Sequence, residues 1–429
     1  MWIRPSQRAV RAVIVASMST YRSQNVVHLL QELASRTGGP EGSRRLAWTP
    51  EWLEARSYFR EALATLPVDI EQDEAGNLWA YLRGAMPQTV VVGSHLDSVP
   101  KGGWLDGALG VMSGVELLRS LAEEGTPACT VAVVDWADEE GARFSRSLFG
   151  SAASMGTLDI EVLRGLSDRE GNKLPDVLAE HGVNIDNLDG CQTRMTDVKA
   201  YVEVHIEQGP VLEHKGLGVA SVIGTNGIER ERLIFRGQAA HSGTMPMSMR
   251  KDSFRAAGRF AIELAEIAER HNGVATIGVA QCWPGVVTAV AGETRISMDM
   301  RHIDANSLAA MFRDAHQAAD RAAEREGCTV EWEHIFRIPP MPFDERLMAA
   351  ARQAVRDIEG HDFELPSGAL HDASEMARRV PTAMIFTSST NGLSHTKEED
   401  TPHDHLRMGA DAFNRTVRRA IEMVAAGEL

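Results

Sequence analysis

The stretch TVVVGSHLDSVPKGGWLDGALGV, Thr89–Val111, decides the fold class. It begins as a run of β-branched residues that ends at Ser94 and His95. A glycine-rich loop follows, and then Gly110–Ala122 carries apolar residues at helical spacing. A second buried-strand pattern, Thr130–Trp136, leads directly into acidic residues. Strands that alternate with helices in this way predict an α/β layer fold with polar side chains at the carboxyl ends of the strands.

A second unit is expected inside this fold. After Val222 the sequence predicts strands and helices in the order Leu233–Phe235, Asp252–Arg270 (helix), Val274–Val279, Arg295–Met300 and Ala305–Glu326 (helix). The first pattern then returns, with elements at Glu345–Ile358, Thr382–Phe386 and Arg407–Ala426. Two helices with one small sheet indicate an α+β unit. We therefore predict a mixed-sheet α/β domain in two parts, 18–221 and 336–429, interrupted by a smaller α+β domain at 222–335.

The composition excludes several classes of protein. With 44 Lys and Arg against 60 Asp and Glu, the formal charge is −16, and no basic patch favours nucleic acid or an anionic membrane surface. Hydrophobic residues make up 43% and charged residues 24%, the balance of a globular protein. No apolar run approaches the roughly 20 residues that span a bilayer. The four cysteines form no CxxC pair, which favours a reducing, cytoplasmic location.

The N-terminus only partly imitates a signal peptide. Arg11 leaves Ala12–Ala16 as the apolar stretch, which is shorter than the usual 7–15 or so residues. We expect residues 1–17 to be a disordered extension, with natural translation beginning at Met18.

The first chemistry-bearing cluster lies in the opening stretch. His95, at a strand end, can offer an imidazole nitrogen to a metal, and Asp97 is placed to orient its ring. Asp106 precedes Gly107, where the backbone can turn tightly and return a carboxylate to the same point. The alternative is a structural histidine and an ordinary Asp-Gly turn.

A second cluster, Asp138-Glu139-Glu140, follows a buried strand. Like charges at this density are unfavourable without a cation. One carboxylate can bind a metal while its neighbour accepts a proton from water. The alternative is a solvated acidic loop.

Two further clusters complete the pattern. Alternation places Glu203, His205 and Glu207 on one face of a strand, and His395 lies in a late loop. Taken together, five residues supply donors for two zinc-like ions about 3.5 Å apart: His95, Asp106, Glu140, His205 and His395.

The sequence resembles the di-metal aminoacylase and carboxypeptidase superfamily, in its branch of N-carbamoyl-L-amino acid hydrolases and allantoate amidohydrolases. The resemblance runs in order through GSHLDSVPKGGWLDGALGV, DEEGARF, YVEVHIEQGPVLE, GQAAHSGTMPMSMRKD, LPSGALHDASEMA and GLSHTKEED. It implies a zinc-peptidase-like catalytic α/β domain interrupted by a lid domain through which two chains form a homodimer.

The resemblance also implies roles for particular residues. Asp106 would bridge two divalent ions (zinc, manganese, cobalt or nickel), with the other four ligands shared between the ions in a pairing that stays open. Glu139 would be the general base. His241 would stabilise the oxyanion, often from the partner subunit.

Substrate contacts follow from the same resemblance. Gln208 would hydrogen-bond the amide or ureido group, and Arg301 would clamp the substrate carboxylate, although a surface ion pair is the alternative for Arg301. Ser367, Gly368 and His371 would line the pocket.

One position departs from the family pattern. Thr288 stands where the family carries an asparagine that aids carboxylate recognition, and Ala291 stands where it carries a proline. A threonine hydroxyl cannot reproduce an amide's carbonyl and two donors. We therefore expect the metal chemistry to be kept and the substrate to differ from the usual one.

The leading hypothesis is hydrolysis of an N-carbamoyl-L-amino acid to amino acid, ammonia and carbon dioxide. The alternatives on the same metal site are allantoate or ureidoglycolate amidohydrolase, β-ureidopropionase and N-acyl amino acid amidase. A catalytically silent binding or scaffold dimer is a further alternative, which the intact ligand set and Glu139 disfavour.

Overall fold

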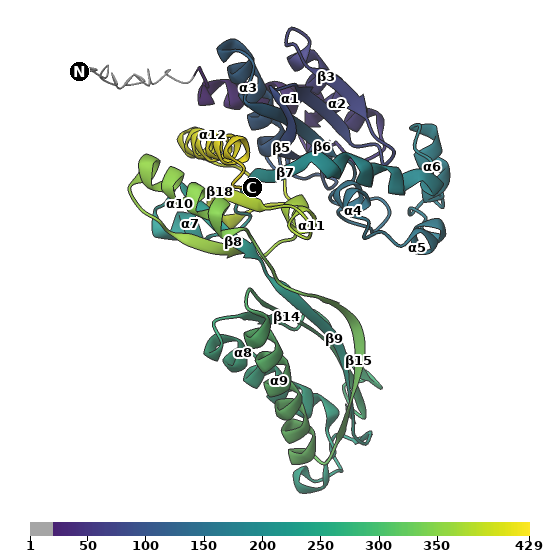
Figure 1. The fold of residues 1–429 in the computed structure, drawn as a ribbon. Helices are drawn as coiled ribbons and strands as arrows, with labels where there is room; N and C mark the ends of the chain where they lie inside the picture. The colour runs from purple at the N-terminus through teal and green to yellow at the C-terminus, as the bar shows by residue number, and fades with distance from the viewer. Residues whose placement is uncertain (1–19) are drawn as a thin grey trace, which may run out of the picture.

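The computed structural model describes residues 20–429 (Figure 1), so the extension predicted at 1–17 lies outside the described residues. Its larger unit is built on a nine-stranded mixed sheet in the order β16-β8-β18-β7-β5-β6-β4-β3, with β17 paired to β8. The strands are β3 (Asp69–Gln72), β4 (Leu78–Leu82), β5 (Met86–His95), β6 (Cys129–Trp136), β7 (Val198–Ile206), β8 (Val219–Thr225), β16 (Met341–Pro342), β17 (Glu364–Ser367) and β18 (Thr382–Thr387).

Four neighbouring strands at the centre of this sheet are parallel. β6, β5, β7 and β18 run side by side in one direction, and they are almost entirely buried. Burial on both faces explains their continuous apolar runs. Because their carboxyl ends meet at one edge of the sheet, the loops that follow them are brought together.

Helices cover both faces of the sheet. On one face the apolar sides of α1 (Ser23–Thr37), α2 (Pro50–Leu63), α3 (Ala108–Glu124) and α12 (His403–Ala426) share a core with the strands. On the other face lie shorter helices, including α4 (Phe149–Met155), α7 (Val211–Lys215) and α11 (Asp372–Met376). α10 (Glu345–Glu359) contributes to both cores. The large unit is completed by β1 (Gly38–Gly39), β2 (Gly42–Ser43), α5 (Ile160–Gly165), α6 (Leu174–Glu180) and the 3-10 helices η1 (Ile185–Asp197) and η3 (Thr390–Gly392).

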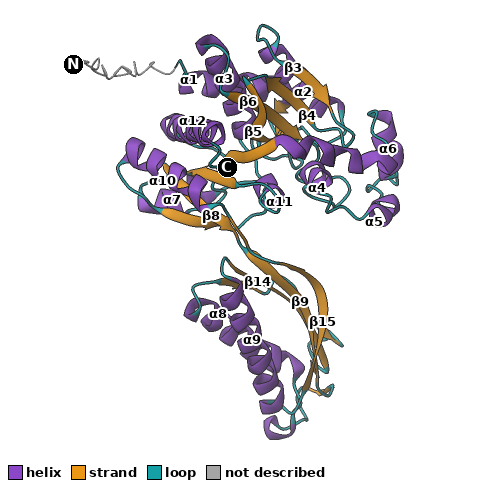
Figure 2. Cartoon of the chain, viewed as in Figure 1, coloured by secondary structure: helices purple, strands orange, loops and turns teal. Residues whose placement is uncertain are grey.

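The part of the chain from Gly227 to Ile338 forms a second layer structure, which we call the inserted unit (Figure 2). Its five-stranded sheet contains β9 (Gly227–Arg236), β11 (Val274–Thr276), β12 (Ala280–Trp283), β14 (Glu293–His302) and β15 (Thr329–Ile338). Two helices, α8 (Ser253–Arg270) and α9 (Ala305–Arg325), pack on one face. A separate two-stranded sheet pairs β10 (Ala240–His241) with β13 (Ala289–Val290), and η2 spans Met247–Met249.

Local signals explain where the inserted unit's helices begin. The side chain of Asp252 accepts the backbone N–H groups of Phe254 and Arg255 at the start of α8, and Asp304 accepts that of Ser307 at the start of α9. Such caps satisfy N–H groups that have no partner inside the helix.

The fold class predicted from the sequence, a mixed α/β sheet with a smaller α+β part, is confirmed. The boundaries expected at 222 and 335 fall inside β8 and β15, because β8 continues to Thr225 in the large sheet and β15 continues to Ile338. From Thr20 to Leu429, no helix combines the length and apolarity needed to cross a membrane.

Candidate metal centre and active site

A cavity of about 190 Å³ lies at the carboxyl ends of the central strands. Because β5, β6 and β7 are parallel neighbours, His95 at the end of β5, the acidic pair after β6 and His205 near the end of β7 converge. The walls carry eight residues singled out from the sequence: His95, Asp106, Glu139, Glu140, His205, Gln208, His371 and His395.

The carboxylate of Asp106 lies at the centre of this cluster. Its Oδ1 is 3.1 Å from Nε2 of His205 and 3.5 Å from Nε2 of His95. Its Oδ2 is 3.2 Å from Nε2 of His395, which lies 3.4 Å from Oε2 of Glu140. The geometry therefore groups His95 with His205, and Glu140 with His395, on opposite oxygens of one carboxylate.

This donor set fits divalent metal ions. Each group of three offers ligand atoms within 4.8 Å of one another, and Asp106 belongs to both groups. Imidazole nitrogens and carboxylate oxygens suit zinc, manganese, cobalt and nickel. Burial, with Asp106 alongside, raises the pKa of Glu140 to about 7. Crowded, buried carboxylates of this kind are stabilised by a cation.

Histidines also act on the carboxylate of Asp106. Although burial opposes the shift, hydrogen bonds with His205 and His395 hold the pKa of Asp106 well below its ordinary value. Gly107, with φ of +64°, makes this loop possible, since a Cβ there would lie 2.5 Å from the ring of His95. Glycine is thus required both by conformation and by close approach.

Asp97 supports the cluster from behind. Its two carboxylate oxygens accept the backbone N–H groups of Glu139 and Glu140, at 3.2 and 3.1 Å. Nδ1 of His95 lies 3.1 Å from the backbone oxygen of Asp97 and 3.5 Å from its Oδ1. Asp97 therefore holds the acidic loop in place. It also lies next to Nδ1 of His95, which leaves Nε2 of that ring free to face a metal.

Glu139 lies beside these candidate metal ligands. Its Oε2 is 3.6 Å from Nε2 of His95, and the side chain is buried. Burial, with Asp372 and Glu140 nearby, raises the pKa of Glu139 well above its ordinary value, even though His95 acts in the opposite direction. A carboxylate with a raised proton affinity at the wall of a cavity can serve as a general base.

Gln208 projects into the cavity from a strained position. Its backbone φ is +58°, and its Nε2 donates to Oδ2 of Asp106 at 2.8 Å. Its Oε1 is buried and has no hydrogen-bond partner among residues 20–429. An unpaired buried acceptor is costly, so this carbonyl is suited to receive an N–H group from a ligand.

The sequence profile of Peptidase family M20/M25/M40 matches residues 91–419. The chain belongs to this family. The N-carbamoyl-L-amino acid amidohydrolase of Geobacillus stearothermophilus is 35% identical over 397 residues, covering 90% of this chain and 96% of the relative. The allantoate amidohydrolase of Escherichia coli is 34% identical over 400 residues, covering 91% and 96%. A solved hydantoinase/carbamoylase family amidase from Burkholderia ambifaria is 33% identical, with a TM-score of 0.84 over 95% of this chain and 98% of that one.

The resemblance inferred from the sequence is confirmed, down to this amidohydrolase branch of the M20 family. The chain is therefore an enzyme, a hydrolase of that branch. Its clustered histidine and carboxylate side chains provide sites that could hold divalent metal.

Four further residues predicted to contact substrate lie between the end of β17 and the start of α11, and at the end of β14. Nε2 of the buried His371 lies 2.9 Å from Oγ of Ser367. The ring of His371 lies 4.5 Å from the ring of His205. Burial and the nearby His205 lower the pKa of His371 well below its ordinary value. Arg301, at the end of β14, donates to the backbone oxygen of Gly368 at 2.6 Å. The inserted unit thus reaches the loop that precedes α11.

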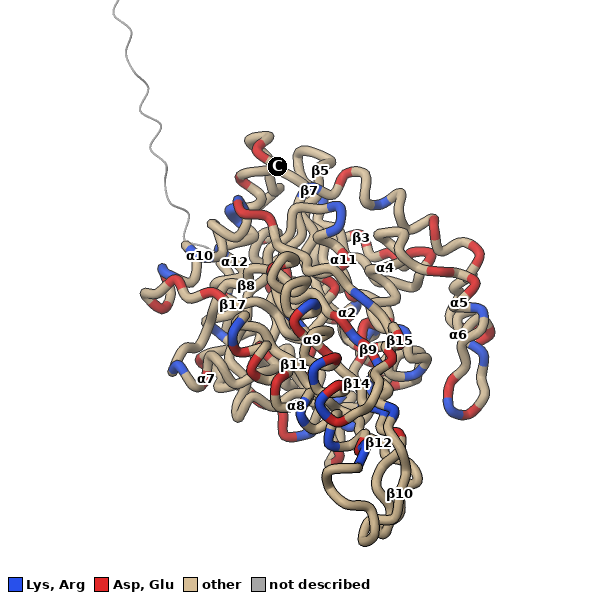
Figure 3. The backbone as a smooth tube through the Cα atoms, turned by 90° about the horizontal axis from the view of Figure 1, so that it is seen from below, with Lys and Arg blue, Asp and Glu red and all other residues tan. Residues whose placement is uncertain are grey.

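Two expected M20-family site residues lie elsewhere. His241 is on β10 and Thr288 immediately precedes β13, and both are exposed. The backbone N–H of Ser242 donates to the oxygen of Thr288 at 2.8 Å, so these positions are neighbours. Figure 3 shows β10 and β12 at an outer end of the inserted unit, apart from β7 and α11. Within one chain they do not join the cavity.

Several supporting residues were not predicted from the sequence. Arg45 is buried, donates from Nε to the oxygen of Leu96 at 2.7 Å, and acts electrostatically on Asp97 and Asp106. Glu399 is buried beside the Asp106 loop. Glu399 lies in the GLSHTKEED string and could have been singled out there, whereas Arg45 carried no sequence signal.

Proposed function

We propose that this chain is an N-carbamoyl-L-amino acid amidohydrolase that uses two divalent metal ions. One observation carries the proposal: the two oxygens of Asp106 face two separate groups of ligands, with Glu139 beside them in the same cavity. The name of the Geobacillus stearothermophilus relative supports the substrate class.

The proposed metal ligands are His95, His205, Glu140 and His395, with Asp106 between the two groups. Two bound ions supply Lewis-acid activation of a water molecule and of the substrate carbonyl. The carboxylate of Glu139 accepts a proton from the water while the water oxygen adds to the ureido carbonyl carbon. Glu139 then gives that proton to the leaving nitrogen as the first carbon–nitrogen bond breaks, which leaves a carbamic acid. The carbamic acid breaks down spontaneously into carbon dioxide and the second amine, so the final products are amino acid, ammonia and carbon dioxide.

Substrate would be held by groups around the ligands. The unpaired Oε1 of Gln208 would accept an N–H of the ureido group, and Arg301 would bind the carboxylate. His371 would line the pocket as a neutral imidazole, held by Ser367, with Gly368 next to Arg301.

The proposal includes a homodimer formed through the inserted unit. Large apolar side chains lie close in sequence to the exposed His241 and Thr288: Met247, Met249 and Val287 are 59, 66 and 99% exposed. Exposed apolar side chains of this kind support the proposal, because they are typical of surfaces that contact another protein. A second copy of the chain would cover it and receive His241, as oxyanion donor, and Thr288 at its own cavity.

A cytoplasmic location is part of the proposal. All four cysteines are free thiols. Chains that fold in oxidising compartments more often carry disulfides.

The test is release of ammonia from a substrate panel after reconstitution with manganese or zinc. The panel contains N-carbamoyl-L-amino acids, N-carbamoyl-β-alanine, allantoate, ureidoglycolate and matching N-acetyl amino acids, and amino acid release is followed in parallel. Ammonia together with amino acid from the carbamoyl-L-amino acids is the expected result. Ammonia from allantoate alone, the substrate named for the Escherichia coli relative, or amino acid without ammonia would overturn the assignment.

A further inference from the structure

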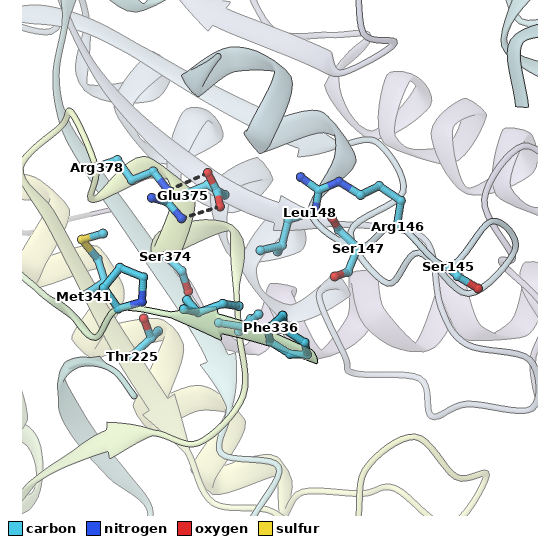
Figure 4. Close-up of a pocket in the computed structure, with 13 residues that line it drawn as sticks. Ser145, Arg146, Ser147, Leu148, Thr225, Phe336, Met341, Ser374, Glu375 and Arg378 are labelled. Carbon is cyan, nitrogen blue, oxygen red and sulfur yellow. Dashed lines mark hydrogen bonds and ion pairs between the residues drawn. The ribbon is translucent and has the colours of Figure 1, made fainter. Parts of the chain in front are cut away.

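A second cavity, of about 340 Å³, adjoins the one that holds the metal ligands. Ser147, Leu148 and Leu370 line both cavities, so a ligand bound in one can extend into the other. The second cavity lies between the loop after β6, the helix α11 and the inner end of β15 (Figure 4). A substituent on the substrate's α-carbon would lie next to it.

Arg146 is an unneutralised positive charge at this cavity. Its side chain extends from the loop toward Leu148 in Figure 4, and Nη1 donates to the backbone oxygen of Ser147 at 2.9 Å. In the described part of the chain, no carboxylate lies within ion-pair distance of its guanidinium. Arg143, on the same loop, differs because Asp168 lies 3.1 Å from its Nε.

The one acidic residue among the lining residues is already engaged. Glu375 accepts Nε of Arg378 at 2.9 Å and Nη2 of Arg378 at 3.2 Å, and also the hydroxyl of Thr157 at 2.8 Å. The charges of Glu375 and Arg378 cancel, which leaves the charge of Arg146 in excess. Burial lowers the pKa of Arg146; Glu375 opposes this shift and Arg378 adds to it.

Much of the remaining lining is apolar. Phe336 and Ile338 from β15, together with Met341 and Leu370, offer no charged group. The cavity therefore combines apolar sides with the half-buried guanidinium of Arg146, which has no carboxylate partner in an ion pair within the described residues. This combination suits a substituent with a short aliphatic stem and an anionic end, since arginine binds carboxylates through paired hydrogen bonds.

We propose that this cavity is the side-chain subsite of the enzyme and that Arg146 binds a carboxylate there. The preferred substrates would then be N-carbamoyl-L-amino acids with acidic side chains. This inference rests on the proposed function for the reaction, but it concerns a specificity-determining residue outside the metal ligands.

The first experiment compares N-carbamoyl-L-glutamate with N-carbamoyl-L-glutamine, which have nearly the same shape and differ in charge. We expect kcat/KM for the glutamate compound to be at least about tenfold higher in the unaltered enzyme, the size of a charged hydrogen bond. Arg146→Gln should remove that preference, mainly by raising KM for the acidic substrate. It should change kcat/KM for the glutamine compound little. Arg146→Lys should keep part of the preference.

The matched control is Arg169→Gln, which removes an exposed arginine that does not line either cavity. This variant should leave kcat/KM unchanged for both substrates. Equal kcat/KM for the two substrates in the unaltered enzyme, or an equal loss for both in Arg146→Gln, would overturn the proposal. Thermal unfolding of each variant identifies a loss that comes from folding.

A binding measurement separates this inference from the proposed reaction. Calorimetric titration of the metal-reconstituted enzyme with L-glutamate and L-glutamine should show tighter binding of glutamate, and Arg146→Gln should abolish the difference. If no carbamoyl compound is hydrolysed while this difference is seen, the proposed reaction fails and the anionic subsite stands. If the two amino acids bind alike, the subsite fails whatever the reaction.

Discussion

The carboxylate of Glu399 accepts a hydrogen bond from the backbone N–H of Asp106 at 3.1 Å, although 293 positions separate the two residues. The same oxygen accepts the N–H of Leu105 at 3.0 Å, and the other accepts the hydroxyl of Ser394 at 2.7 Å. Close approach requires Gly103, where a Cβ would lie 2.1 Å from the Glu399 side chain. Glu399 thus joins the loop of Asp106 to the loop that carries His395.

Replacing Glu399 should weaken metal binding without removing a ligand. Glu399→Ala leaves two backbone N–H groups without their acceptor and releases both loops, so we expect metal affinity to fall about 10- to 100-fold. Competition with a chromogenic chelator measures the change. Glu398→Ala alters the exposed neighbour and should match the unaltered protein; an equal effect of both variants would contradict a positioning role for Glu399.

Glu139 and Glu140 are adjacent in the sequence, but replacing each of them should impair the enzyme in a different way. Glu139→Gln keeps the ligand set, so metal content should be unchanged while turnover falls by about 10²- to 10⁴-fold. Glu140→Gln removes a carboxylate ligand beside His395, so metal content itself should fall. Elemental analysis with single-turnover assays distinguishes the two. Near-normal turnover in Glu139→Gln would rule out its role as the base.

His241 should act on the partner's cavity. Co-expression of His241→Ala with Glu139→Gln produces mixed dimers in which one of the two sites combines an intact Glu139 with an intact His241. With random pairing, activity should recover to about a quarter of the unaltered level, because half of the dimers are mixed and each has one working site. Each variant alone should be nearly inactive. No recovery in isolated mixed dimers would place His241 in its own subunit's site, and normal activity of His241→Ala alone would place it outside the chemistry.

A buried ion pair between Arg56 and Asp135, close to His95, should contribute strongly to the free energy of unfolding. Nε of Arg56 lies 2.7 Å from Oδ2 of Asp135, both side chains are buried, and Oδ1 of Asp135 accepts the N–H of Leu96 next to His95. Arg56→Ala leaves a buried carboxylate unpaired and should lower the free energy of unfolding by about 3–5 kcal/mol.

Urea denaturation of the same variant measures this loss. Arg60→Ala, at an exposed position of the same helix, should change the free energy by no more than about 0.5 kcal/mol. Similar values for the two variants would contradict the role assigned to the pair.

Sequence patterns predicted the elements that carry the strongest periodicity. The strand before His95, the helix that follows and the two long helices of the inserted unit lie within a few residues of their expected bounds. β15 was not predicted: its alternating TVEWEHIFRI contains a register shift between His334 and Phe336, and its residues alternate between exposed and half-buried, without the continuous apolar run of a core strand.

The site was predictable only as far as local patterns extend. The ligands stand out because histidines and carboxylates follow strands at the same edge of a sheet. Arg45 does not, since its contact with Leu96 depends on which distant loops meet. The grouping of His95 with His205 likewise depends on which oxygen of Asp106 each ring faces.

The inserted unit leaves and rejoins the large sheet at one place. Thr225 of β8 pairs with Met341 of β16, and Ile228 of β9 pairs with Ile338 of β15. Every donor grouped around Asp106 lies outside that insertion, whereas Arg301, His241 and Thr288 lie within it. We therefore expect substitutions of Arg301 or Thr288 to alter the contacts with substrate while the donor set around Asp106 stays in place.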